Sequence, residues 1–170
     1  CRSEVRRVWK VDIYLETDSK VQKNMDRRCG YVLETICAGA IRTVEGFSRI
    51  SGTYHSANLQ NLAAALSRIT KTSRICVHTE DAYVVAHITK LSEMAETAWK
   101  DSKGGLIRNA DLWKNIWELA EKHRLEITAN TDKHSYSGWL QEQMAAGRCE
   151  KDMEKQTERK VMCQMSGYHY

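Results

Sequence analysis

The sequence predicts an α/β domain in which a mixed sheet of five strands is covered by helices on both faces. The chain has 170 residues, of which 42% are hydrophobic and 28% charged, and these values are typical of one globular domain. Strand-like segments come first as a run of three and later alternate with helical segments. This order favours an antiparallel meander that is extended by parallel strands and packed between helices.

The first half of the chain contains three strand segments and the clearest helix. Residues 8–15 are rich in β-branched and aromatic side chains and end in a polar turn, which indicates a central strand. Residues 29–36 and 41–50 have a similar composition and are joined around Gly39, so they predict two further strands of a meander. Residues 56–69 carry leucines at helical spacing after Ser56, a residue type that caps helices.

The second half alternates between strands and helices. Residues 73–79 and 125–130 are the expected strands, and the expected helices cover 82–99, with interruptions, a segment that begins at Asp111, and 136–146. Residues 100–109 form a loop with two glycines. Because strand crossovers are right-handed, segment 73–79 is expected to lie parallel to segment 8–15, so that both strands end at the same edge of the sheet.

Charge and cysteine content narrow the class of protein. We expect a domain over residues 8–146 and a charged tail over 147–170 that is helical or frayed. A net charge of +4 permits binding to phosphates without requiring it. No apolar run is long enough for a membrane span, and residues 1–10 are unlike a signal peptide, so we expect a cytoplasmic protein with no membrane partner.

The six cysteines contain no C-x-x-C pair and are expected to be reduced thiols, with a zinc site of Cys149, Cys163 and His169 as the alternative.

Two of the expected strands end in closely spaced acids, namely Glu16 and Asp18 in IYLETDS, and Glu80 and Asp81 in HTEDAYV. At this point the chain resembles the ribonuclease H family. The resemblance also rests on LQNLAA at residues 59–64, on the tryptophan-bearing basic segment at 99–108 followed by NADLW, and on KH at 133–134. These motifs occur in the family's order over residues 8–144, and similar I-E-T, H-T-E-N and K-H-S-Y-S motifs occur in a divergent bacterial branch of the family.

The resemblance implies a ribonuclease H-like sheet and hydrolysis of the RNA strand of an RNA–DNA hybrid. The family uses four carboxylates that hold two Mg²⁺ ions ~4 Å apart. Carried over residue by residue, the expected catalytic residues are Glu16, Gln60, Glu80, His134 as a proton shuttle, and Glu142, which lies beside the fourth acid position near Met144. The expected ligands of Mg²⁺ or Mn²⁺ are Glu16, Asp18 and Glu80.

The resemblance also implies a nucleic-acid interface for RNA–DNA hybrid or another duplex. Its expected residues are Asn58, Trp99, Lys100, Lys103 and Arg108. Several of the implied roles have a structural alternative, because Trp99 can pack in a core and the basic side chains can belong to an ordinary solvated loop.

Further alternatives concern the acidic and polar motifs. Asp81 can cap the helix that follows it, Gln60 can be a solvated helix residue, and His134 can be a loop residue with no function.

The departures from the family pattern set the expected activity. Two glutamates stand where the family has aspartates, and the other two acid positions are Gln60 and the neighbourhood of Met144. We therefore expect slow, metal-dependent cleavage that is faster with Mn²⁺ than with Mg²⁺. The alternative is a catalytically inactive nucleic-acid-binding or interaction module on the same fold, and a third reading is a structural protein that keeps only the core.

Overall fold

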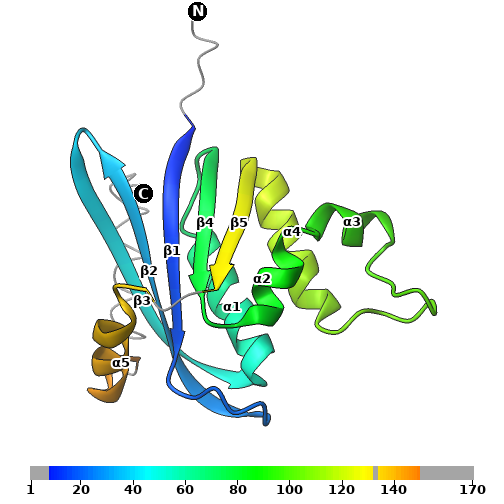
Figure 1. Cartoon of the computed structure of the whole chain (residues 1–170), viewed down its shortest axis with the longest axis horizontal. Helices are drawn as coiled ribbons and strands as arrows, with labels where there is room; N and C mark the ends of the chain where they lie inside the picture. The colour runs from blue at the N-terminus through cyan, green and yellow to red at the C-terminus, as the bar shows by residue number, and fades with distance from the viewer. Residues whose placement is uncertain (1–7, 132–133, 150–170) are drawn as a thin grey trace, which may run out of the picture.

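The five strands form one mixed sheet in the order β3-β2-β1-β4-β5 (Figure 1). This computed structural model describes residues 8–131 and 134–149. Strands β1 (Trp9–Thr17), β2 (Met25–Cys37) and β3 (Ala40–Gly52) are an antiparallel meander, whereas β4 (Ser73–Thr79) and β5 (Leu125–Thr131) run parallel to β1. The predicted α/β architecture, including the parallel pairing of the strands at 8–15 and 73–79, is confirmed.

Helices cover both faces of this sheet. Helix α1 (Tyr54–Leu66) packs on β1, β2 and β3 and on α4 (Ala110–His123), which also contacts β5. Helix α2 (Ala82–Ile88) lies against β4 and β5, α3 (Leu91–Glu96) contacts α4, and α5 (Ser137–Ala145) covers β1 and β2 from the opposite face.

Two helix boundaries differ from the sequence prediction. Helix α1 begins at Tyr54 because Thr53 is its N-cap, with a side chain that accepts a hydrogen bond from the Ser56 N–H. The segment expected as one interrupted helix at 82–99 forms α2 and α3, which are separated at Thr89 and Lys90.

Alternation along β1 divides the apolar residues between two cores. Val11, Ile13 and Leu15 are buried in the main core beneath α1 and α4. On the other face, α5 closes a smaller cluster of Val32, Phe47, Leu140, Met144 and Cys149. Polar side chains of β1 therefore share a face with α5, and this places Glu16 beneath that helix.

Two residues that follow the predicted boundary at residue 146 pack against the domain. Cys149 is fully buried, and the Arg148 guanidinium lies 4.7 Å from the centre of the Phe47 ring and 3.0 Å from Glu45. Residues 150–170 of the predicted tail lie outside the described residues, as do Cys163 and His169 of the alternative zinc site. Cys29 and Cys37 are free thiols.

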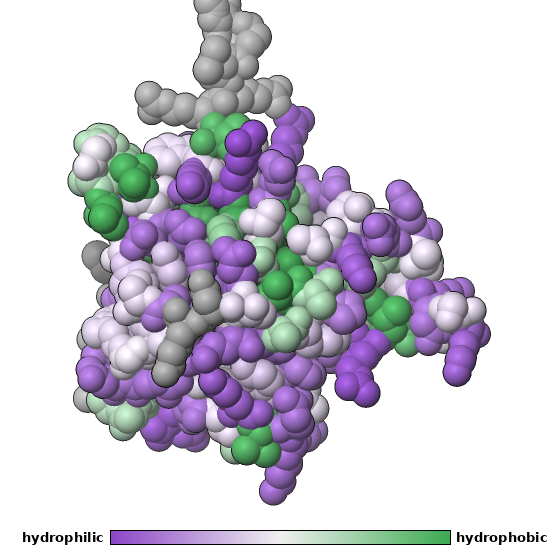
Figure 2. All heavy atoms as spheres, in the orientation of Figure 1, coloured by the Kyte–Doolittle hydropathy of each residue, from purple (hydrophilic) through white to green (hydrophobic). Residues whose placement is uncertain are grey.

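The surface seen in Figure 2 is mostly hydrophilic, with small separate hydrophobic patches. One patch lies at the tip of the β2–β3 hairpin, where Ile36 and Ile41 pair across the strands and are both exposed. Within the described part of the chain, no helix has the length and apolar character needed to cross a membrane.

Candidate active site at the carboxyl end of the sheet

Glu16 is a buried carboxylate at the end of β1. It lies two residues beyond Tyr14, which is the last residue of β1 paired with β4, through His78. Glu80 follows β4 directly and therefore reaches the same edge of the sheet. We call the end of the sheet that carries Glu16 and Glu80 the acidic edge; it is the lower edge in Figure 1.

Three side chains from beyond β5 surround the Glu16 carboxylate. The Ser137 hydroxyl donates to Oε2 at 3.1 Å, the Gln141 amide donates to Oε1 at 2.9 Å, and His134 Nε2 lies 3.3 Å from Oε2. Burial alone would raise the pKa of Glu16, but these hydrogen bonds, together with the coulombic effect of His134, lower it further than burial raises it. Its pKa thus lies below the ordinary value, and Glu16 is held in its charged form.

The surroundings of His134 specify its tautomer. Nε2 lies 3.1 Å from the Leu15 carbonyl oxygen, which can only accept, while Nδ1 lies 3.3 Å from the Tyr136 N–H, which can only donate. These partners place a proton on Nε2, from which His134 can donate to Glu16. The buried His134 side chain thus has both ring nitrogens engaged.

Glu80 has a cationic partner. Lys20, in the loop between β1 and β2, places its Nζ 2.5 Å from Glu80 Oε2, and the Lys20 side chain is 55% exposed. A pair this exposed contributes little to stability. A cation other than Lys20 can therefore replace it at modest cost.

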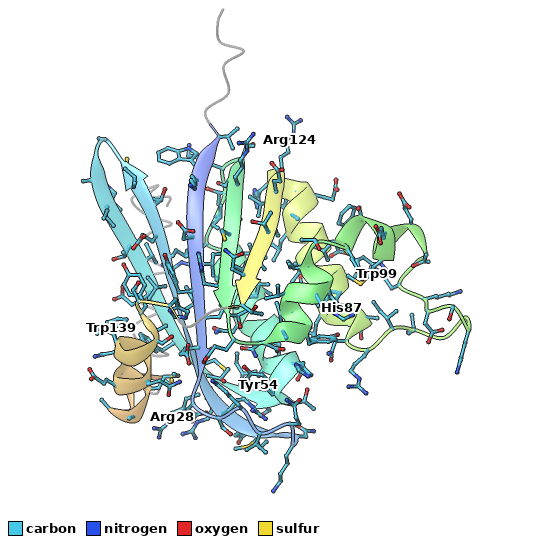
Figure 3. The ribbon with its side chains drawn as sticks, in the orientation of Figure 1. Arg28, Tyr54, His87, Trp99, Arg124 and Trp139 are labelled. Atoms are coloured by element: carbon cyan, nitrogen blue, oxygen red, sulfur yellow. The ribbon has the colours of Figure 1, made fainter. Side chains whose placement is uncertain are left out.

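Tyr54, at the start of α1, lies close enough to the acidic edge for the carboxylates there to change its pKa (Figure 3). Burial, followed by the negative charges of Asp81, Glu80 and Glu16, raises its pKa to about 12, against the effect of a hydrogen bond with Asn58. One phenol therefore feels all three carboxylates, as expected when strand ends converge.

Asp81 does not face the acidic edge as a free ligand. It is the N-cap of α2 and accepts from the Tyr83 N–H at 3.0 Å, while His55 Nδ1 lies 2.9 Å from its carboxylate. The Asn58 amide also donates to it, at 3.0 Å. Asp81 therefore caps α2, as the alternative interpretation predicts. Asn58, which was expected at the nucleic-acid interface, is buried and bonded to Asp81.

Asp18 and Gln60 lie close to their expected positions but have other partners. Asp18 is exposed, and its Oδ1 accepts from the Arg28 N–H at 3.1 Å, which extends the ladder between β1 and β2. The Gln60 amide donates to the Ser51 carbonyl at 3.4 Å, near the end of β3.

The family's fourth acid position, which was expected near Met144, does not bring an acid to Glu16. Met144 is fully buried in the apolar cluster beneath α5, so a carboxylate at that position would face hydrophobic side chains. Glu142 is exposed on the outer side of the same helix. It is Gln141 that contacts Glu16, and it also donates to the Thr17 carbonyl at 2.7 Å.

The basic segment, residues 99–108, projects beside α3 and is the loop at the right of Figure 1. Lys100, Lys103 and Arg108 are exposed along it. Trp99 is only 9% exposed and belongs to the main core (Figure 3). Its indole is therefore not presented for stacking on a nucleic acid, and the packing alternative holds for this residue.

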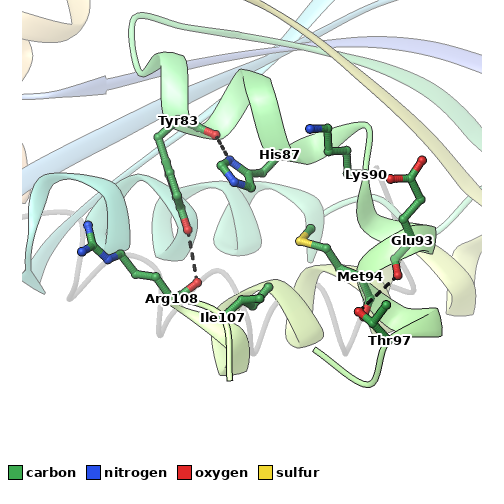
Figure 4. Close-up of a pocket in the computed structure, with 8 residues that line it drawn as sticks. All are labelled: Tyr83, His87, Lys90, Glu93, Met94, Thr97, Ile107 and Arg108. Carbon is green, nitrogen blue, oxygen red and sulfur yellow. Dashed lines mark hydrogen bonds between the residues drawn. The ribbon is translucent and has the colours of Figure 1, made fainter. Parts of the chain in front are cut away.

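A pocket of about 330 Å³ lies at the base of the basic segment (Figure 4). Its lining comes from α2, α3 and the residues before α4: Tyr83, His87, Lys90, Glu93, Met94, Thr97, Ile107 and Arg108. The Tyr83 hydroxyl donates to the Arg108 carbonyl at 3.2 Å and accepts from Trp113 Nε1 at 2.9 Å. This bond links α2 to the end of the basic segment.

Curated proteins with similar sequences are named Ribonuclease H or Ribonuclease HI. A Ribonuclease H from Caldicellulosiruptor saccharolyticus is 23% identical over 118 residues, 68% of this chain and 80% of the relative. A Ribonuclease HI from Xylella fastidiosa is 32% identical over 63 residues, 36% of this chain and 42% of the relative. These similarities support assignment of the chain to the ribonuclease H family. No family model matches it, and the match spans less than half of the Xylella protein.

Solved structures confirm the ribonuclease H fold. LC9-RNase H1, described as a type 1 RNase H with the type 2 active-site motif, superposes with a TM-score of 0.61 at 19% identity, over 79% of this chain and 69% of that one. The foamy viral protease-reverse transcriptase in complex with RNA/DNA hybrid superposes at 0.58 with 12% identity, over 81% of this chain and 19% of that one. At these identities the likeness extends to the fold alone.

Sequence reasoning missed three residues of this candidate site. Ser137 and Gln141 hold Glu16, and Lys20 holds Glu80. The spacing of four residues between Ser137 and Gln141 places both on one helix face, and that pattern could have identified them. No comparable pattern marks Lys20, because a loop lysine is exposed in most proteins.

Proposed function

We propose that this protein binds RNA–DNA hybrid and hydrolyses its RNA strand slowly, using a divalent ion held by Glu16 and Glu80. The observation that carries the proposal is the buried Glu16, which His134, Ser137 and Gln141 hold in its charged form. Hydrogen bonds offset only part of the cost of burying a charge. A cation at the acidic edge would supply the remaining stabilisation.

The donor set suits one hard divalent ion. Glu16 and Glu80 offer the carboxylate oxygens that Mg²⁺ and Mn²⁺ prefer. Gln60 is bonded to Ser51 and Met144 is in the apolar cluster, so neither adds a charged ligand for a second ion. When bound, a divalent ion supplies Lewis acidity and neutralises charge on the phosphodiester. The chain itself orients Glu16 through α5 and attracts the phosphate backbone through the basic segment.

The alternative proposal is a binding module without catalysis. Lys20 already neutralises Glu80, and two of the family's four acid positions hold no acid. Both proposals share the hybrid as partner, and only the chemistry distinguishes them.

A cleavage assay on end-labelled RNA–DNA hybrid decides between the two. We expect cuts in the RNA strand, faster with Mn²⁺ than with Mg²⁺, that disappear in Glu80→Gln and increase in Gln60→Glu. A DNA duplex of the same sequence is the control for strand selectivity, and hybrid binding is measured separately in chelator.

Two outcomes would overturn the catalytic proposal. Binding with no cleavage by the wild type or by Gln60→Glu, with either ion, assigns the fold to binding alone. Absence of binding supports a protein that keeps only the structural core.

A further inference from the structure

A second group of metal-binding side chains lies on the sheet, away from the acidic edge. Asp12 of β1 is paired with Cys76 of β4, and His78 lies two residues further along β4. Their ligand atoms, a carboxylate oxygen, a thiol sulfur and an imidazole nitrogen, all lie within 4.8 Å of one another. All three side chains are half-buried, which lets an ion reach them.

Neighbouring side chains hold these groups in place. His78 Nε2 lies 3.0 Å from Asp12 Oδ1, and the His78 ring is stacked on Tyr14, with ring centres 4.5 Å apart and planes at 13°. The Asn130 amide of β5 donates to Cys76 Sγ at 3.4 Å. This hydrogen bond orients the Cys76 sulfur, and the thiolate is the form of cysteine that binds metals.

The cluster is separate from the site proposed for catalysis. Asp12 and Glu16 are four residues apart on one strand, which at 3.3 Å per residue is roughly 13 Å. The two ions of a two-metal phosphodiesterase lie only ~4 Å apart. An ion at Asp12 therefore cannot take part in the same two-ion centre as one at Glu16.

We propose that Asp12, Cys76 and His78 form a binding site for Zn²⁺ or another thiolate-preferring divalent ion. Cysteine and histidine are characteristic ligands of Zn²⁺, whereas Mg²⁺ prefers oxygen alone. The ion takes the place of the proton between Asp12 and His78, and the thiol of Cys76 loses its proton on binding. Three protein ligands leave one tetrahedral position for water or another small ligand. The site goes beyond the proposed function and does not depend on it.

Co²⁺ titration of the reduced full-length protein tests this site, because thiolate ligation of Co²⁺ gives a charge-transfer absorption in the near ultraviolet. We expect one equivalent to produce this band, Zn²⁺ to remove it by competition, and Cys76→Ser to abolish it. His78→Ala and Asp12→Asn should each weaken Co²⁺ binding by roughly tenfold or more. Cys37→Ser is the matched thiol control, and Glu16→Gln shows independence from the acidic edge; both should retain the band.

Two results would overturn the proposal. One is the absence of a band in the folded wild type at millimolar Co²⁺. The other is a band that persists in Cys76→Ser, which would assign thiolate ligation to a different cysteine. Circular dichroism of each variant, and of His78→Ala in particular, separates lost ligation from lost folding.

Discussion

At the scale of single residues, Glu16 is an anion kept in the interior by three side chains. Ser137, Gln141 and His134 each contribute a hydrogen bond to its carboxylate. Exchanging the carboxylate for an amide of the same shape places an N–H₂ group against these donors. The ionisation of Glu16 therefore affects both the stability of the fold and the proposed binding of a cation.

The variant Glu16→Gln should show this link through its pH dependence. Because the pKa of Glu16 is lower in the folded protein than its ordinary value near 4.5, its ionisation stabilises the fold above that pH, and this contribution is lost as the pH falls below it. We expect Glu16→Gln to lower the free energy of unfolding by about 1–3 kcal/mol at pH 7, with a difference that shrinks on acidification. Urea unfolding between neutral and acidic pH measures it. The exposed Glu142→Gln is the control, and a pH-independent difference would contradict the assignment.

Lys20 should compete with a metal ion for Glu80. Removing its ammonium group in Lys20→Ala leaves Glu80 without its cationic partner, so the affinity for Mn²⁺ should rise several-fold and the concentration needed for half-maximal cleavage should fall. Lys23→Ala removes the same charge from the same exposed loop and is the matched control. Calorimetric titration measures the affinity, and equal effects in both variants would show only a change in net charge.

At the scale of elements, α5 serves two purposes on two of its sides. Ser137 and Gln141 are four residues apart and face Glu16, while Leu140 and Met144, also four apart, enter the apolar cluster. The packing of the second pair fixes the position of the first. An acid introduced at Met144 would be buried among hydrophobic side chains, so position 141 is the better place to restore one.

The variant Gln141→Glu should partly rebuild the family's acid set. A second carboxylate next to Glu16 repels it in the absence of metal, so the melting temperature should fall in chelator and recover with Mn²⁺. Cleavage of labelled hybrid should become faster than in the wild type. Gln143→Glu makes the same charge change on the same helix and serves as the control. A melting temperature that does not respond to Mn²⁺ would exclude an ion beside position 141.

Sequence patterns predicted the strands and the main helices, but they did not predict every residue of the candidate site. Alternation and helical spacing predicted all five strands and the main helices, because burial imposes those periods on the chain. The acidic edge followed from parallel pairing of the segments that contain Glu16 and Glu80. Lys20 could not be predicted, because a contact across 60 residues of sequence pairs it with Glu80. The spacing of Ser137 and Gln141 marks one helix face, but not its contact with Glu16 across 125 residues.

At the scale of the whole molecule, the acidic edge and the basic segment are separate surfaces. The carboxylates lie at the lower edge of the sheet in Figure 1, and the basic segment projects beyond α3. A duplex bound for cleavage would have to reach both. Affinity should then depend on the basic segment, and chemistry on the acidic edge.

Replacing Lys100, Lys103 and Arg108 together by alanine should test this division of roles. Loss of three phosphate contacts should weaken hybrid binding and reduce the slope of log affinity against log salt by ~2–3. The control removes three exposed basic residues, Arg42, Lys71 and Arg74, that lie outside both the acidic edge and the basic segment. Fluorescence anisotropy at several salt concentrations gives both slopes. An unchanged slope in the first triple variant would assign the segment to folding or to a protein partner.

The order of synthesis gives the Glu16 hydrogen bonds a further consequence. Glu16 is made 125 residues before Gln141, so at 5–20 residues per second it waits roughly 6–25 s on the ribosome for that partner. The antiparallel hairpin of β2 and β3 is local in sequence and can pair well before then. A nascent chain can therefore carry this hairpin while the Glu16 carboxylate is not yet held by α5. The proposed metal site is completed only when α5 docks, after the hairpin has formed.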